Sequence, residues 1–202
     1  MSVGGGSLLI GEGTQGNVIA AGPGSETLAG SPSGNDILYA GSGPDVIFGG
    51  GGKDTLVGAD GSILIGGSTQ GDVIAAGSGN ETLASSPAGN DVLFAGAANG
   101  VIFTGSGDDS VVSGTGNMQI VAGAGRGTFD FNNGMGGGST IIWNFTQGRD
   151  QVALFGYGAG IVPGLLASAV VSGGSTTITL PDNTRITFGN LTQLNANKLF
   201  AA

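Results

Sequence analysis

The chain has 202 residues, of which 45 are glycine, 9% are charged and 39% are hydrophobic. Its 14 acidic residues outnumber its five basic ones, and the net charge of −9 argues against nucleic acid and anionic membranes as partners and favours cations. Without cysteine or histidine the chain has no disulfide, no thiolate metal site and no imidazole base. No apolar run is long enough to span a bilayer as a helix, so we expect no membrane insertion.

Residues 7–48 align with residues 62–103 without a gap, and 28 of the 42 aligned positions are identical. The full repeat pairs 7–58 with 62–113. Within it, short apolar segments recur every eight to ten residues, centred on Leu9, Ile19, Leu28, Leu38, Ile47, Leu56, Leu64, Ile74, Leu83, Leu93, Ile102 and Val111. A disordered linker has no reason to keep this spacing. The repeat therefore predicts a solenoid, in which short strands bury one continuous core by stacking.

Turns rich in Gly, Ser and Asn separate the apolar segments and leave no room for a helix. Two units of about nine residues make one coil, so residues two units apart should stack in columns. One column of turn-ending residues consists of Asn17, Asp36, Asp54, Asp72, Asp91 and Asp109, and the other consists of Glu26, Asp45, Ser62, Glu81, Gly100 and Asn117. Carboxylates stacked one coil apart repel each other unless a cation neutralises them.

The pattern G-G-x-G-x-D-x-U-x, in which U is a large aliphatic residue, fits GGGGKDTLV (49–57) at every fixed position. AGSGPDVIF (40–48) and TGSGDDSVV (104–112) miss only the first glycine. Over roughly residues 7–127 the chain resembles the RTX (haemolysin-type) calcium-binding β-roll family. The resemblance implies an all-β fold, with a parallel β-roll, or β-solenoid, of about nine-residue half-coils over residues 1–127 and a C-terminal β-rich cap over 128–202.

In the RTX family, calcium lies between the turns of successive coils and is bound by turn carbonyls and aspartate side chains. Carried over residue by residue, the resemblance assigns metal ligands to Asp36, Asp54, Asp91, Asp109 and Asp45, each preceded by a glycine two positions earlier (Gly34, Gly52, Gly89, Gly107 and Gly43). Asp72 belongs to the same column as the first four, although its turn, Thr-Gln-Gly, fits the pattern less well. The alternative is the same fold without metal, because aspartate in turns commonly accepts hydrogen bonds from nearby backbone N–H groups.

The central residue of each short strand should point inward and its neighbours outward. In this chain the outward neighbours are also apolar, and they should stack into stripes that include Tyr39, Phe48, Val57, Ile65, Phe94, Phe103 and Val112. Stripes of this kind usually mark protein contacts, so we expect them to form an assembly interface between copies of the chain. The alternative is that these residues only reflect β-propensity on a small sheet.

Residues 128–202 lose the nine-residue spacing and gain aromatic residues. STTITL (175–180) and TRITF (184–188) flank Pro-Asp-Asn and predict a β-hairpin, and PGLLASAV (163–170) predicts a short helix. The resemblance implies that this region caps the roll and carries a type I secretion signal. The first residues lack the basic and long apolar segments of a signal peptide, so we expect an extracellular protein that is exported without one.

Together these features favour a secreted calcium-binding structural protein that folds as an RTX β-roll outside the cell. It would assemble with itself into a filament, a sheet, a biofilm matrix or a surface layer. The first alternative is a monomeric calcium-dependent adhesin or carbohydrate-binding module, and a lesser one is an ice-binding solenoid. Because no separate catalytic domain is present and histidine and cysteine are missing, we expect no enzymatic activity.

Overall fold

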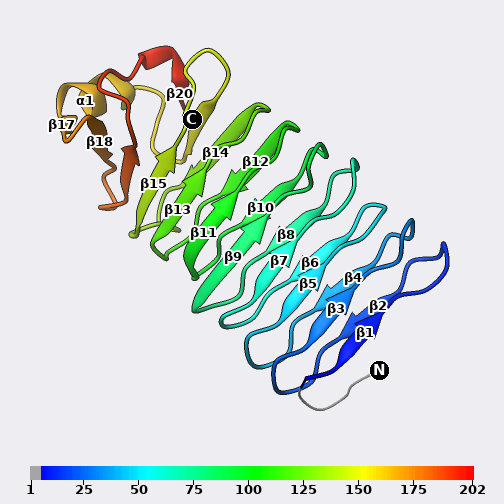
Figure 1. Ribbon diagram of the computed structural model, residues 1–202. Helices are drawn as coiled ribbons and strands as arrows, with labels where there is room; N and C mark the ends of the chain where they lie inside the picture. The colour runs from blue at the N-terminus through cyan, green and yellow to red at the C-terminus, as the bar shows by residue number, and fades with distance from the viewer. Residues whose placement is uncertain (1–5) are drawn as a thin grey trace.

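The computed structural model describes residues 6–202, which form two β-sheets wound as a solenoid along one axis (Figure 1). One sheet has 11 strands, in the spatial order β1 (Leu8–Ile10), β3 (Thr27–Ala29), β5 (Val46–Phe48), β7 (Ile63–Ile65), β9 (Asn80–Ala84), β11 (Asn99–Phe103), β13 (Met118–Val121), β15 (Ser139–Trp143), β19 (Arg185–Phe188), β18 (Ser175–Thr179) and β17 (Val170–Ser172). We call it the odd sheet.

The other sheet, the even sheet, has nine strands in the order β2 (Val18–Ala20), β4 (Ile37–Tyr39), β6 (Thr55–Val57), β8 (Val73–Ala75), β10 (Val92–Phe94), β12 (Asp109–Val112), β14 (Gly127–Asn132), β16 (Gln151–Phe155) and β20 (Leu199–Ala201). Up to β16, consecutive strands alternate between the two sheets, so every coil contributes one strand to each. Neighbouring strands within a sheet are parallel as far as β19 and β20. The predicted all-β solenoid is confirmed.

The core is a double row of aliphatic side chains between the sheets. In the even sheet Leu38 pairs with Leu56 of the next coil, and in the odd sheet Leu28 pairs with Ile47 of the next coil. All twelve predicted central residues are buried, and from Leu28 to Val111 none exposes more than 1% of its surface. Full burial of each such side chain is worth about 1.5–3 kcal/mol, which no single three-residue strand obtains alone. Stacking therefore stabilises the fold.

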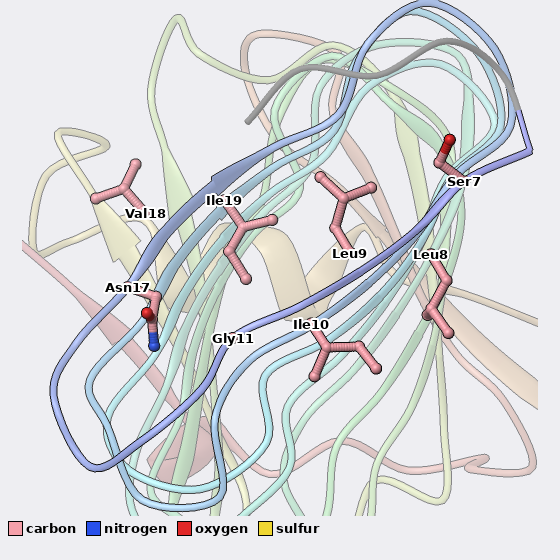
Figure 2. A pocket seen from close by; sticks show the side chains of 8 residues that line it. All are labelled: Ser7, Leu8, Leu9, Ile10, Gly11, Asn17, Val18 and Ile19. Carbon is pink, nitrogen blue, oxygen red and sulfur yellow. The ribbon is translucent and has the colours of Figure 1, made fainter.

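At the N-terminal end of the described solenoid, the first coil lines an open hollow of about 530 Å³. Figure 2 shows Leu9 of β1 and Ile19 of β2 pointing toward the space between the two strands, with Leu8 and Val18 pointing away from it. Leu8 and Val18 are 64% and 68% exposed. The alternation of inward and outward side chains is thus already complete in the first coil.

Both sheets continue beyond residue 127, where β14 and β16 extend the even sheet and β15 and β19 extend the odd one. The predicted hairpin is confirmed, because β18 and β19 pair in antiparallel register around Pro181 to Asn183. A helix also forms, α1 (Val162–Ala167), but it ends earlier than expected because β17 begins at Val170. A short 3-10 helix, η1 (Ala196–Lys198), precedes β20.

Aromatic rings close the core at the C-terminal end. The ring of Phe145 lies 6.1 Å from that of Phe129 and 4.9 Å, edge to face, from that of Phe188, measured between ring centroids. These residues come from the roll, from the loop after β15 and from the hairpin, so the cap and the last coils share one core. No helix within residues 6–202 is long and apolar enough to cross a bilayer.

Candidate metal-binding turns

The predicted column of aspartates forms at the edge where the chain enters the even sheet. Strand register places Asn17, Asp36, Asp54, Asp72, Asp91 and Asp109 side by side in successive coils. We call these residues the first ladder. Each of its five aspartates exposes at most 2% of its surface. Parallel pairing thus brings together carboxylates from successive coils, which are well separated in sequence, inside a largely apolar solenoid.

One oxygen of each ladder aspartate is used in the same way. Oδ1 of Asp54 accepts a hydrogen bond of 2.7 Å from the backbone N–H of Asp36, one coil earlier. The same bond joins the other neighbours of the ladder, with donor–acceptor distances of 2.6 to 2.9 Å. These carboxylates therefore replace the backbone carbonyl that would otherwise pair with each N–H, and they tie successive coils together.

The second oxygen is satisfied in four of the five aspartates. At Asp36 and Asp91 a serine five residues earlier donates both its backbone N–H and its hydroxyl to Oδ2. Gly67 donates its N–H to Asp72, and Gly105 and Ser85 donate to Asp109. Burial acts to raise the pKa of Asp36, but the bonds from Asn17 and Ser31 outweigh it and the pKa is lowered. In these four turns the aspartates accept the hydrogen bonds that the alternative fold without metal predicts.

Asp54 is different. Its Oδ2 is buried and has no hydrogen-bond partner, although it ends the GGGGKD turn that fits the nine-residue pattern completely. Burial, together with the charges of Asp72 and Asp36, raises the pKa of Asp54 to about 7. The other four aspartates each receive a backbone N–H from the turn before them, with or without a serine hydroxyl, and Oδ2 of Asp54 receives none. This oxygen is a ready ligand for a cation.

The glycines predicted beside the aspartates allow the turns to stack. A Cβ atom at Gly52 would lie 2.1 Å from the carbonyl oxygen of Gly34 in the preceding coil, and one at Gly43 would lie 2.1 Å from that of Gly24. A Cβ atom added at Gly34, Gly89 or Gly107 would lie 1.7 to 2.4 Å from a carbonyl oxygen of the preceding coil. Only glycine allows the turn backbones to approach this closely, which brings carbonyl oxygens near the carboxylates.

The second column lies at the opposite edge, where the chain enters the odd sheet. The strand register confirms the predicted stacking of five residues in this column, Glu26, Asp45, Ser62, Glu81 and Gly100. The prediction was wrong by one residue at its end, because Gly100 pairs with Met118 rather than with Asn117. A four-residue β13 begins there, and Asn117 instead accepts the backbone N–H of Ser139 through its side-chain oxygen.

Asp45 is satisfied like the first-ladder aspartates, since Oδ1 accepts from the N–H of Glu26 and Oδ2 from that of Gly41. The two glutamates are not. Both carboxylate oxygens of Glu26 and one of Glu81 are buried without a partner. Burial raises the pKa of Glu26, with Asp45 adding to the effect. The sequence predicted that both glutamates belong to this column. It did not predict them as metal ligands, because the nine-residue pattern has aspartate at the ligand position.

Asp150 continues the first ladder beyond the predicted repeats. Its Oδ1 accepts the N–H of Gly127, the register neighbour of Asp109, and its Oδ2 accepts the N–H of Thr146. The sequence carried a signal, because Gly148, Asp150 and the fully buried Val152 repeat the G-x-D-x-U spacing. The longer loop between β14 and β15 interrupts the nine-residue spacing, so this match falls out of step with the earlier repeats.

At Asp150 a side chain supplies the positive charge. Nε of Arg149 lies 3.0 Å from Oδ1 of Asp150, and Nη1 donates a 2.9 Å hydrogen bond to the carbonyl of Ala124 in the preceding coil. The only other ion pair among residues 6–202 joins Arg126 and Asp108 at the surface. Within residues 6–202 no basic side chain forms an ion pair with the five aspartates of the first ladder, so only hydrogen bonds, protons or an external cation can offset their charge.

The donor set fits calcium, a hard cation that takes six to eight oxygen ligands. Asp54, Glu26 and Glu81 have unpartnered carboxylate oxygens at the ends of glycine-rich turns, and the chain has no histidine or cysteine to supply a softer ligand. No three acidic side chains within residues 6–202 converge on one point. Each turn would therefore supply one carboxylate, with backbone carbonyls and water completing the shell.

Comparison with known families agrees with this geometry. The model of the RTX calcium-binding nonapeptide repeat matches residues 33–62 and 88–117, in four copies. Residues 33–62 and 88–117 of the solenoid are therefore RTX repeats. RTX nonapeptide repeats bind calcium and are typical of secreted proteins. The two matched segments contain Asp36, Asp45, Asp54, Asp91 and Asp109, five of the six aspartates that the sequence nominated; Asp72 and both glutamates lie outside them.

Among solved structures, the RTX chain is similar to the extracellular lipase LipA from Serratia marcescens, with a TM-score of 0.50 and 16% sequence identity. The alignment covers 99% of this chain and 40% of the lipase chain, so the RTX chain spans less than half the length of that enzyme. At this identity the likeness concerns the fold alone. No curated protein sequence matches the chain.

Proposed function

We propose that this RTX chain is a structural protein that folds with calcium outside the cell and assembles with itself into a filament, sheet or surface layer. Catalysis has no part in this proposal, since the chain lacks histidine and cysteine and its buried acids end turns rather than line a cleft. The observation that carries it is the chemistry of the two outer faces, which differ from those of an ordinary soluble solenoid.

Large apolar side chains line up on both faces. On the odd sheet Phe48 is 41% exposed and Phe103 45%, and they lie in one column with the half-buried Ile65. On the even sheet Tyr39 and Phe94 are 43% and 40% exposed, in one column with the half-buried Val57 and Val112. From β1 to β13 no strand residue of either face carries a charge except at turn ends. Flat uncharged columns of this kind favour packing against another copy.

Calcium would act as the switch for folding. Ladder neighbours stand one strand spacing apart, about 4.8 Å, and at an effective dielectric constant of about 20 two unit charges at that distance repel by on the order of 3 kcal/mol. Where calcium is scarce, this repulsion and the ordering of glycine-rich turns oppose folding. Where calcium is abundant, binding stabilises the folded state by mass action and creates the apolar faces.

Electron microscopy and sedimentation velocity on the full chain, with millimolar calcium and after its removal, test the proposal. Ordered polymers that form with calcium are expected. Phe48→Ser combined with Phe103→Ser should abolish or weaken assembly if the odd face is the contact, and Tyr39→Ser combined with Phe94→Ser tests the even face. Val170→Ser removes a 62% exposed side chain from β17, away from the columns of both faces, and serves as the control. Calcium-induced folding to monodisperse monomers would reject assembly and favour a monomeric binding module.

A further inference from the structure

Glu81 is a buried acid that the nine-residue pattern does not explain. It lies in β9, exposes 1% of its surface, and accepts a 2.8 Å hydrogen bond from the N–H of Gly77 through Oε2. Its Oε1 is buried and has no partner. An unpaired buried carboxylate oxygen is costly, because it has given up water and gained no hydrogen bond in return.

The lost partner can be traced to the turn at residues 58–62. In the columns, a carboxylate oxygen normally accepts the N–H of the neighbour one coil earlier, as Asp45 does from Glu26. The neighbour of Glu81 is Ser62, whose N–H instead donates to the carbonyl of Ala59 inside its own turn. This shortened turn therefore withholds the donor and leaves Oε1 free.

A second carboxylate, that of Asp60 in the preceding coil, lies against the turn that leads to Glu81. A Cβ atom added to Gly79 would lie 1.7 Å from Oδ1 of Asp60, so the exposed Asp60 lays its carboxylate over the turn that ends at Glu81. In the other direction, a Cβ atom at Gly58 would lie 3.1 and 3.2 Å from the two carboxylate oxygens of Glu81. Each acid thus reaches into the turn of the other, and glycine makes room for it on both sides.

We propose that Asp60 and Glu81 together bind a divalent cation, calcium, between the turns at residues 58–62 and 77–81. The two acids carry like charge, and no ion pair to either is formed within residues 6–202, which leaves an external cation to hold them together. Hard carboxylate oxygens on adjacent glycine-rich turns are ligands of the type that calcium selects. The site uses a turn residue, Asp60, at a position to which the nine-residue pattern gives no ligand, and a glutamate outside the matched repeats. The inference rests on the proposed calcium-dependent function and adds a specific site to it.

Equilibrium dialysis of the full chain against radioactive calcium gives the number of ions bound. Glu81→Gln and Asp60→Asn, each nearly isosteric, should each lose one bound calcium or weaken one site at least tenfold, and the double variant should lose no more than either single one. Glu12→Gln, which changes an exposed acid in the first turn, is the matched control and should bind as wild type does. Circular dichroism in calcium checks that each variant retains the fold.

Wild-type stoichiometry in both variants would overturn the site while leaving calcium binding by the aspartate ladder intact. A loss in Glu81→Gln but not in Asp60→Asn would overturn the pairing of the two acids. A wild-type chain that binds no calcium at all would refute the proposed function as well, so the two failures are distinguishable.

Discussion

Replacing Asp54 by asparagine isolates the buried charge of the first ladder. The asparagine side chain would keep an Oδ1 that can accept the N–H of Asp36, and it would remove the negative charge from an oxygen that has no partner. Burial raises the pKa of this carboxyl to about 7 from an ordinary value of 3.8. Because the folded pKa lies above the unfolded one, the folded chain binds an additional proton. Without metal, the contribution of this carboxyl to stability is therefore present at low pH and is lost as the pH rises through about 7.

The size of the effect follows from linkage. Between pH 5 and pH 7 the unfolded carboxyl is ionised while the folded one is still largely protonated, and each pH unit then costs about 1.4 kcal/mol. Asp54 should therefore contribute on the order of 3 kcal/mol of lost stability between pH 5 and pH 8 in the metal-free chain. Asp54→Asn should remove this part of the pH dependence, and calcium should flatten it in the wild type.

Urea unfolding followed by circular dichroism, at pH 5 and pH 8 in metal-free buffer and in calcium, measures these free energies. Asp108→Asn, at an exposed residue in the turn that ends at Asp109, three coils away, is the control and should change as the wild type does. If Asp54→Asn kept the full wild-type loss between pH 5 and pH 8, the unpaired oxygen would not be the origin of the raised pKa. If it also kept full stabilisation by calcium, Asp54 would not be a ligand.

Three further substitutions test the stacking, with unfolding free energies from urea titration in calcium. Leu64→Ala should cost about 2–5 kcal/mol because Leu64 is fully buried, whereas the outward Ile65→Ala should cost clearly less, and equal losses would contradict the assigned faces. Gly52→Ala should cost more than about 1 kcal/mol, since φ is +113° and a carbonyl stands 2.1 Å from the new Cβ; a neutral result would show that the turns can separate. Arg149→Gln should lower the unfolding free energy by roughly 2 kcal/mol, which is less than for a fully buried ion pair because Arg149 is partly exposed. An unchanged unfolding free energy would mean that Asp150 does not need the charge of Arg149.

The repeated spacing was enough to predict the solenoid, its parallel stacking and the burial of the twelve central residues from Leu9 to Val111. Those features depend on a local pattern that is read within one or two repeat units. Strand periodicity and the Pro-Asp-Asn turn likewise predicted the hairpin of β18 and β19. The ladder from Asp36 to Asp109 followed from the same spacing, since parallel strands leave little freedom in which residues stack.

The state of each carboxylate was decided only by the tertiary structure. Asp36 and Asp54 have the same place in the repeat, yet one has both oxygens bonded and the other has a free one. The difference depends on whether the turn before the aspartate supplies a hydrogen-bond donor, as Ser31 does at Asp36. Glu81 depends on a donor in the preceding coil, which the shortened turn at 58–62 redirects. The sequence by itself thus determined where the charges stack, whereas contacts between coils determined which of them lack a partner, because each hydrogen-bond donor comes from whichever backbone N–H the length and composition of a turn place nearby.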